Sequence, residues 1–198
     1  MRATHKTQLL GRSFYARDGR VVAPELLNKL LVRGRRVGRI VEVEAYCGAE
    51  DPASHAYRGR SRRNATMFGP PGHLYVYFTY GMHHCANVVC GREGEATAVL
   101  LRALEVVDGL DEMRAAYPGL RRDRDLCRGP ARLCRALDMD RGLDGADLVT
   151  GDRGLVVADD GTPPPAHPGV GRRVGISAAI DLPWRFTVAG SPALSRPA

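Results

Sequence analysis

The spacing of apolar residues along the chain predicts its main elements. Residues 20–34 place four leucines at helical spacing, so they predict a helix with Pro24 in its first turn. Residues 36–46 alternate between apolar and polar side chains and predict a strand. Residues 73–80 are dense in aromatic and β-branched side chains and predict a second strand, with residues 85–90 as its returning partner.

Later segments complete an arrangement in which strands outnumber helices. Residues 96–104 predict a third strand, residues 126–137 a helix, and residues 172–189 one or two final strands. The chain shows no internal repeat and no domain linker, and residues 193–198 are typical of a frayed tail. We therefore expect a single α+β domain, residues 1–198, with an antiparallel core.

A long irregular loop is predicted between the first two strands. Residues 48–72 are rich in glycine, proline, serine and arginine, and such a loop inside a compact domain is usually functional. It carries four arginines within six positions, namely Arg58, Arg60, Arg62 and Arg63. Guanidinium groups match phosphate oxygens, so these residues are candidates for a phosphate clamp, with a solvated charge run as the alternative.

The first predicted strand is expected to present acids and an aromatic ring together. Alternate residues of a strand share a face, so Glu42, Glu44 and Tyr46 are expected to point one way. The opposite face is expected to hold Val41, Val43 and Ala45. An acid beside an aromatic ring suits a pocket that stacks a planar ring next to a proton acceptor. A solvated face of an edge strand is the alternative.

Tyrosines recur on one face of the next strand. Tyr75, Tyr77 and Thr79 are expected on one side, and Leu74, Val76 and Phe78 on the other. Stacking on an aromatic ring contributes roughly 1–3 kcal/mol per base, enough for two facing tyrosines to hold an extruded base. Tyr80 and Met82 fall at the hairpin tip, where an aromatic side chain is a candidate wedge for the gap left by a flipped nucleotide.

Composition favours a polyanionic partner. The chain of 198 residues has a formal net charge of +7, and since Lys6 and Lys29 are its only lysines, nearly all positive charge is arginine. Few lysines are therefore available as Schiff-base nucleophiles. The five cysteines form no C-x-x-C pair and the six histidines give no zinc spacing, so we expect no metal and no cofactor.

No segment is typical of a secreted or membrane protein. Residues 1–6 lack the apolar stretch of a signal peptide, and no run approaches the ~20 apolar residues that span a bilayer. Scattered cysteines suit a reducing compartment. We expect a cytoplasmic protein without membrane contact.

Several short motifs occur in one order along nearly the whole chain. They are residues 44–46, His55, residues 60–68, residues 72–82, Asn87, residues 100–105, residues 129–134 and residues 173–176. In this order and spacing they resemble the alkyladenine (3-methyladenine) DNA glycosylase family, the mammalian-type enzymes, over residues 8–192. The resemblance implies a single α+β domain built on a curved antiparallel sheet with peripheral helices.

The resemblance also implies catalytic roles. Glu44 would be the general base that deprotonates the attacking water, and Arg102 and the backbone carbonyl of Val174 would help hold that water. An alkylated purine is cationic and leaves as a neutral base, so it needs little help from an acid, while a carboxylate stabilises an oxocarbenium-like sugar. Burial would raise the pKa of Glu44 and Arg102 would lower it.

The same resemblance implies how a flipped purine is held. The residues are Tyr46 on one face of the base, His55 and Tyr77 on the other, and Asn87 where the exocyclic amine of guanine is disfavoured. Tyr80 would be the intercalating wedge, with Met82 beside it in the minor groove. The implied partner is double-stranded DNA that contains damaged purines, bound by a monomeric hydrolase without a lyase step. In a bacterium the protein would be associated with the nucleoid.

Two other interpretations stay open. Residues 167–173 resemble a helix-hairpin-helix turn of another glycosylase architecture, with Asp181 as its candidate acid; a helix at residues 160–167 would favour it, but the prolines at 163–165 argue against one. The second is a non-catalytic damage- or RNA-binding module on the same scaffold. Glu44 distinguishes it, because a pure binder has no use for a carboxylate beside a stacked base.

Overall fold

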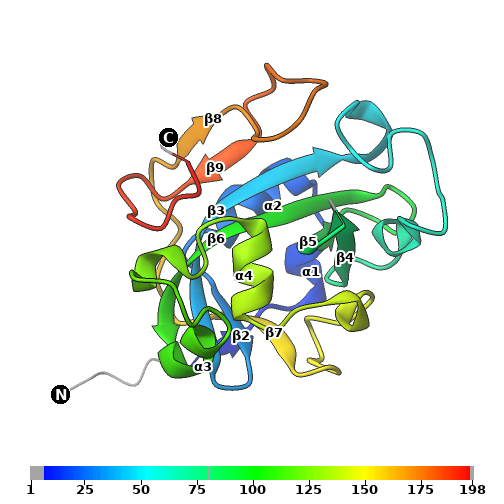
Figure 1. Cartoon of the computed structure of the whole chain (residues 1–198). Coiled ribbons are helices and arrows are strands. Elements are labelled where there is room, and N and C mark those ends of the chain that lie inside the picture. Colours follow the sequence, from blue (N-terminus) through cyan, green and yellow to red (C-terminus); the bar gives the residue numbers. More distant parts are fainter. Residues whose placement is uncertain (1–6, 80, 197–198) are drawn as a thin grey trace.

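Nine strands form one antiparallel sheet over residues 7–79 and 81–196, the part of the chain that this computed structural model describes (Figure 1). They are β1 (Gln8–Leu9), β2 (Leu30–Arg33), β3 (Arg36–Cys47), β4 (Leu74–Thr79), β5 (His83–Cys90), β6 (Thr97–Asp108), β7 (Leu155–Asp159), β8 (Gly169–Gly171) and β9 (Arg185–Thr187). The main path runs β1-β7-β2-β3-β6-β5-β4, and β9 joins β3 and β8 beside it. The two longest strands, β3 and β6, pair with each other and curve across the molecule.

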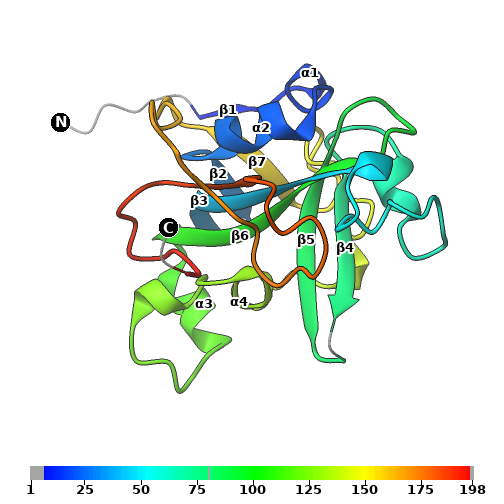
Figure 2. The same ribbon diagram turned by 90° about the horizontal axis from the view of Figure 1, so that it is seen from above.

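Short helices cover both sides of this sheet in the described residues. They are α1 (Arg12–Tyr15), α2 (Gly19–Leu26), α3 (Leu110–Ala115) and α4 (Pro130–Ala136), with 3-10 turns at Gly48–Glu50, Ala65–Phe68, Asp123–Asp125 and Arg141–Leu143. Figure 2 shows α1 and α2 on one side of the strands and α3 and α4 on the other. The expected α+β fold, a curved antiparallel sheet with peripheral helices, is confirmed. Within the described ranges, no helix has the length and apolar content needed to cross a bilayer.

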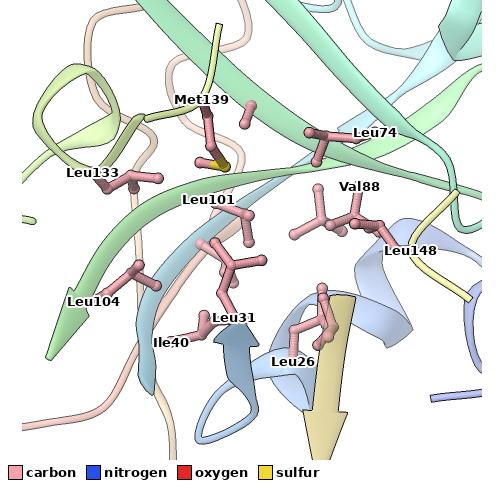
Figure 3. Close-up of a cluster of buried hydrophobic side chains, with 14 of the residues drawn as sticks. Leu26, Leu31, Ile40, Leu74, Val88, Leu101, Leu104, Leu133, Met139 and Leu148 are labelled. Carbon is pink, nitrogen blue, oxygen red and sulfur yellow. The ribbon is translucent and has the colours of Figure 1, made fainter. Parts of the chain in front are cut away.

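A continuous apolar core joins the sheet to the helices (Figure 3). Leu26 of α2, Leu31 of β2 and Leu101 of β6 are completely buried, and Leu133 of α4 belongs to the same cluster. Burying a leucine stabilises the fold by about 1.5–3 kcal/mol relative to leaving it exposed. This core therefore fixes the positions of β3, which carries Glu42 and Glu44, and of β6, which carries Arg102.

The helix expected over residues 20–34 is wrong in its second half. α2 ends at Leu26, so Pro24 lies near its end and not in its first turn. Asn28 then takes a left-handed backbone conformation (φ 67°), which asparagine tolerates better than most residues, and the chain continues into β2. The four leucines are buried in this helix–turn–strand arrangement, as they would be in a longer helix. Their spacing alone therefore does not distinguish a long helix from a short helix followed by a strand.

A bulge in β3 changes which of its side chains share a face. The pairing of β3 with β6 is irregular at Val41, which has no partner opposite it. Val41 packs in a small separate cluster, whereas Val43 and Ala45 belong to the main core. The expectation that these three residues share one face is therefore wrong at Val41. Glu42 and Glu44 nevertheless both form ion pairs with Arg102.

Other predicted boundaries hold in part. The loop expected at residues 48–72 and the β4–β5 hairpin are confirmed, and β6 extends the strand expected at 96–104. The helix expected at 126–137 is shorter, because Gly129 has a φ of 118° and lies outside the helical conformation. Within 172–189 only β9 is a strand, since β8 ends before this segment and the residues between them are irregular.

The C-terminal segment is not frayed where the structure describes it. Ala193 and Leu194 are buried, and Ser195 makes hydrogen bonds into the protein interior. The tail expected at 193–198 is therefore wrong at its start, because apolar burial and buried acceptors hold this part of the chain.

Candidate active site

A cavity of about 470 Å³ lies among β3, β4, β5, β6 and the irregular segment after β8, which is orange in Figure 2. Its lining consists of Tyr46, Pro52, Ala53, His55, Met67, Tyr75, Tyr77, Thr79, Cys85, Asn87, Leu100, Arg102, Pro130 and residues 174–178. The expected site residues among these are Tyr46, His55, Tyr77, Asn87, Arg102 and Val174. The fold thus brings six separated sequence positions to one hollow.

Glu44 stands directly behind the cavity wall. Its side chain is fully buried and is not itself part of the lining. Its Oε1 accepts a hydrogen bond from the backbone N–H of Val174 (2.7 Å), and its Oε2 accepts one from the hydroxyl of Tyr46 (3.0 Å). The Nη1 of Arg102 lies 3.3 Å from Oε2. The carboxylate is therefore held by three residues that do line the cavity.

The two glutamates of β3 have pKa values shifted in opposite directions. Burial raises the pKa of Glu44, and the three contacts just described only partly offset it. Burial acts on Glu42 too, but hydrogen bonds from Ser195 and the charge of Arg102 outweigh it and lower its pKa. Two neighbouring acids with pKa values shifted in opposite directions are typical of active sites in which one acid exchanges a proton and the other stays charged.

Aromatic and imidazole rings form much of the cavity wall. The rings of His55 and Tyr77 meet edge to face with centroids 4.5 Å apart. The Nδ1 of His55 lies 3.1 Å from the hydroxyl of Tyr75. Burial and the charge of Arg63 lower the pKa of His55, so its ring is neutral near pH 7. A neutral imidazole can contact a cationic ligand without charge repulsion.

The ring of Tyr46 packs against the guanidinium of Arg173. The guanidinium carbon lies 4.6 Å from the centroid of Tyr46 and 5.0 Å from that of Trp184. The same group donates to both carboxylate oxygens of Asp51 (2.5 and 2.8 Å) and to the carbonyl oxygen of Ala45 (3.0 Å). Because the ion pair is fully buried, it ties the segment after β8 to the loop after β3.

Sequence reasoning missed Asp51 and Arg173 as parts of the site. Asp51 falls in the predicted irregular loop and Arg173 in a segment for which strands were expected, and no sequence signal indicated that they meet. Leu100 was also missed, although it lies two residues before Arg102 on β6, and strand alternation could have found it. Residues 175–178 close the cavity from a segment in which strands were expected.

Asn87 has a fixed place in the cavity wall. It lies opposite Tyr75 in the β4–β5 pairing and opposite Leu100 in the β5–β6 pairing. Its side-chain amide donates to the carbonyl oxygen of Tyr75 (3.2 Å). Strand pairing on both sides therefore sets how far this amide reaches into the cavity.

All five cysteines are free and buried: Cys47, Cys85, Cys90, Cys127 and Cys134. Cys85 lines the cavity. Burial raises the pKa of Cys47 and of Cys127 to about 12 and raises the pKa of the other three thiols as well. Each therefore remains a protonated thiol at neutral pH.

The four loop arginines are exposed, and one of them approaches the cavity. Arg63 lies 5.8 Å from the ring centroid of Tyr77. Arg58, Arg60 and Arg62 make no hydrogen bond or ion pair with the described residues. Their charges face solvent and are available to a partner.

The hairpin tip is described only in part. Met82 is 68% exposed and borders a second hollow of about 690 Å³, which α4 also lines. Tyr80, the expected wedge, lies outside the described residues.

A helix-hairpin-helix site is contradicted. Residues 160–167 contain no helix, and β8 occupies part of the expected turn. The side chain of Asp181 is 86% exposed, pairs with Arg172 (2.8 Å) and does not line the cavity. The prolines at 163–165 belong to an extended connection.

A family profile and several known proteins match nearly the whole chain. The sequence profile of a family described as "Methylpurine-DNA glycosylase (MPG)" matches residues 13–192. Proteins named "Putative 3-methyladenine DNA glycosylase" are similar to the chain in three organisms. The Burkholderia lata protein is 57% identical over 96% of this chain and 92% of its own. The Streptomyces avermitilis protein is 50% identical over 94% and 90%. The Carboxydothermus hydrogenoformans protein is 48% identical over 95% and 99%.

Proposed function

Because the chain belongs to the methylpurine-DNA glycosylase family, we propose that it flips alkylated purines out of duplex DNA and hydrolyses their N-glycosidic bond. It is a monofunctional glycosylase, a hydrolase of N-glycosyl compounds, and its product is an abasic site. Lys29, the one lysine among the described residues, pairs with Asp159 and does not line the cavity, so a Schiff-base lyase step is not part of the proposal.

The cavity supports the binding of an extruded base. Its volume of about 470 Å³ falls within the range of roughly 300–1,000 Å³ that is common for ligand pockets. Tyr46 would stack on one face of the base, with His55 and Tyr77 on the other. Base–aromatic stacking contributes roughly 1–3 kcal/mol per base and so offsets much of the few kcal/mol that unstacking costs.

Glu44 would act as the general base. A water placed between Arg102 and the backbone carbonyl of Val174 would give a proton to the carboxylate and attack the anomeric carbon of the sugar. The bond to the purine breaks and its electron pair leaves with the base, which a 3- or 7-alkyl group has already made cationic. The carboxylate also stabilises the positive charge that develops on the sugar. The hydroxyl of Tyr46 covers Oε2 in the free protein, so the water must enter beside it.

One observation carries this proposal: the buried carboxylate of Glu44, with a raised pKa, is held by three residues of the cavity wall. A buried acid in that position adds nothing to a pure binder. The binding-module alternative has no observation of its own in its favour, and the family match opposes it.

The proposed substrates are 3-methyladenine and 7-methylguanine, since both leave as neutral bases. Hypoxanthine and ethenoadenine are neutral lesions and would need a proton on the leaving base. Release of free base from duplexes that carry each lesion, followed by alkali cleavage, ranks the four. Strand breaks before alkali would contradict the monofunctional reaction.

Glu44→Gln tests the mechanism. We expect this variant to bind lesion DNA with unchanged affinity and to lose single-turnover excision by about 10²–10⁴-fold, the contribution of a general base. Glu50→Gln is the matched control, because that side chain is 76% exposed and its variant is expected to keep the full rate. Undiminished excision by Glu44→Gln would remove this residue from the role.

A further inference from the structure

Glu42 is completely buried but has no part in the chemistry proposed above. Its Oε1 accepts hydrogen bonds from the Nε of Arg102 (2.9 Å), the Nε of Arg185 (2.8 Å) and the hydroxyl of Ser195 (2.7 Å). Its Oε2 accepts a hydrogen bond from the backbone N–H of Ser195 (2.6 Å). Charge-assisted hydrogen bonds of this length are strong, so Glu42 is a fixed anion behind the cavity wall.

Ser195 closes this arrangement from the C-terminal segment. Its hydroxyl donates to Glu42 and accepts from the Nη2 of Arg102 (3.0 Å), so the three side chains form a closed ring. The segment itself is held by Arg128, which donates to the carbonyl oxygen of Leu194 (2.7 Å). The end of the chain is therefore built into the wall that carries Arg102.

Glu42 and Ser195 together limit how Arg102 meets Glu44. Two of its nitrogens, Nε and Nη2, are engaged by Glu42 and Ser195, and only Nη1 approaches Glu44, at 3.3 Å. Arginine–carboxylate pairs frequently adopt a two-nitrogen fork, and without this restraint Arg102 is free to form one on Glu44. A fork on Glu44 would neutralise the proton acceptor and occupy the space where the water must lie.

We propose that Glu42 and Ser195 are positioning residues that divide Arg102 between two carboxylates and so keep Glu44 basic and open to water. This inference rests on the proposed function of Glu44. It adds two residues, one of them near the end of the chain, that act on the reaction through Arg102.

The charged and titratable groups around Glu44 set the direction of the expected change. They are Glu42 and Tyr46 on β3, Arg102 on β6, Cys85 on β5, Arg185 on β9 and Arg173 after β8. Of the carboxylates, Glu42 is the one that acts with burial to raise the pKa of Glu44. Removing its charge leaves the cationic groups in place, so the pKa of Glu44 falls and it becomes a weaker base.

Glu42→Gln is the first test, in single-turnover excision of a duplex that contains 7-methylguanine, measured as a function of pH. We expect the plateau rate to fall about tenfold, less than the 10²–10⁴ of a missing general base, and the acidic limb to move to lower pH. Affinity for the lesion duplex is expected to stay unchanged. A folded variant with the wild-type rate and an unshifted limb overturns the proposal.

Ser195→Ala is the second test, and it applies even if Glu42→Gln does not fold. It keeps every charge and the hydrogen bond from the backbone N–H of residue 195 to Glu42. A slower plateau and a shifted limb are expected. The matched control is Ser191→Ala, which removes a hydroxyl of the same segment that bonds to Glu105 (2.6 Å) away from this ring. A wild-type profile for Ser195→Ala, or equal losses in both serine variants, overturns the proposal and leaves only a structural role for the tail.

A readout without turnover separates this inference from the proposed function. The pKa of Glu44, followed by carboxyl ¹³C NMR, is expected to be lower in Glu42→Gln and shifted in Ser195→Ala, but not in Ser191→Ala. An unshifted pKa overturns the positioning role even if excision is observed. Absence of base release by the wild-type protein would overturn the proposed function, and the NMR result would still stand.

Discussion

At the scale of single residues, two acids two positions apart in β3 share one arginine, but their pKa values are shifted in opposite directions. Glu42 is surrounded by donors that stabilise its charge, and its pKa is lowered. Glu44 has fewer donors and the stronger effect of burial, so its pKa is raised. The difference arises from neighbours that other segments bring to β3, and it gives one acid a fixed charge and leaves the other able to accept a proton.

The hydroxyl of Tyr46 can be tested apart from its ring. It donates to Glu44 and thereby lowers the pKa of that carboxyl. Tyr46→Phe removes this hydrogen bond, so the pKa of Glu44 rises and a higher pH is needed to ionise it. We expect the acidic limb of single-turnover excision to move to higher pH, opposite to the shift in Glu42→Gln, with little change in affinity for the lesion duplex.

Tyr77→Phe is the control for this prediction, because its hydroxyl is not among the groups bonded to Glu44. Its limb is expected to stay in place. The same shift in both variants would show that loss of any cavity hydroxyl suffices and would contradict a specific effect of Tyr46.

Strand alternation predicted the pocket residues Tyr46 and Tyr77, because side chains two positions apart share a face whatever the rest of the fold does, whereas Arg102 was expected only from the family resemblance. It did not predict the contacts of Glu42, whose partner Ser195 lies 153 residues away. Such a contact depends on where the C-terminal segment packs, and nothing in the local pattern of either residue carries that information.

At the scale of elements, two irregular segments are as important to the site as the strands. The loop after β3 contains only short 3-10 turns, the segment between β8 and β9 contains neither helix nor strand, and the buried pair of Asp51 and Arg173 joins them. Asp51 also accepts the backbone N–H groups of Cys47 and Ala53. This ion pair and its hydrogen bonds therefore help to hold the part of the cavity wall that the two irregular segments form.

Asp51→Asn is expected to destabilise the protein strongly. It leaves the guanidinium of Arg173 buried without a counter-charge, and breaking one partner of a buried pair costs about 3–5 kcal/mol. Urea denaturation measures the free energy of unfolding. Asp181→Asn is the control, since its pair with Arg172 is 86% and 70% exposed and is expected to change stability by less than about 0.5 kcal/mol. Equal losses would contradict an anchoring role for Asp51.

The elements that were predicted well are those with a long apolar pattern, such as β3, the β4–β5 hairpin and β6. The missed or shortened ones have other determinants. The helix at residues 20–34 was extended too far because the left-handed turn at Asn28 interrupts a continuous leucine pattern. The strand β7 was not predicted, although it pairs with both β1 and β2, because it begins with four consecutive apolar residues and shows no alternation.

At the scale of the whole molecule, the arginines differ in whether their charge is paired with an acid. Many arginines are paired with acids, but Arg58, Arg60 and Arg62 project from the loop after β3 without partners among the described residues. A net charge of +7 favours DNA in general, and these three groups lie on the loop that also supplies Pro52, Ala53 and His55 to the cavity wall.

Salt titration of duplex binding tests this placement. We expect each of the changes Arg58→Ser, Arg60→Ser and Arg62→Ser to reduce the slope of log K against log salt by about 0.9, the effect of one lost phosphate contact. Arg35→Ser is matched in charge and is expected to leave the slope unchanged, since Arg35 is 87% exposed in the β2–β3 turn, at the other end of β3. Equal slopes in all four variants would mean that charge acts only through its total.

The burial of every cysteine has a consequence for survival during chemical stress. Methylating reagents react fastest with accessible, electron-rich nucleophiles, and in proteins the thiolate is foremost among them. Here each cysteine is buried and each thiol is kept protonated, although Cys85 also lines the cavity. We therefore expect the protein to lose little activity on exposure to reagents that methylate accessible thiols.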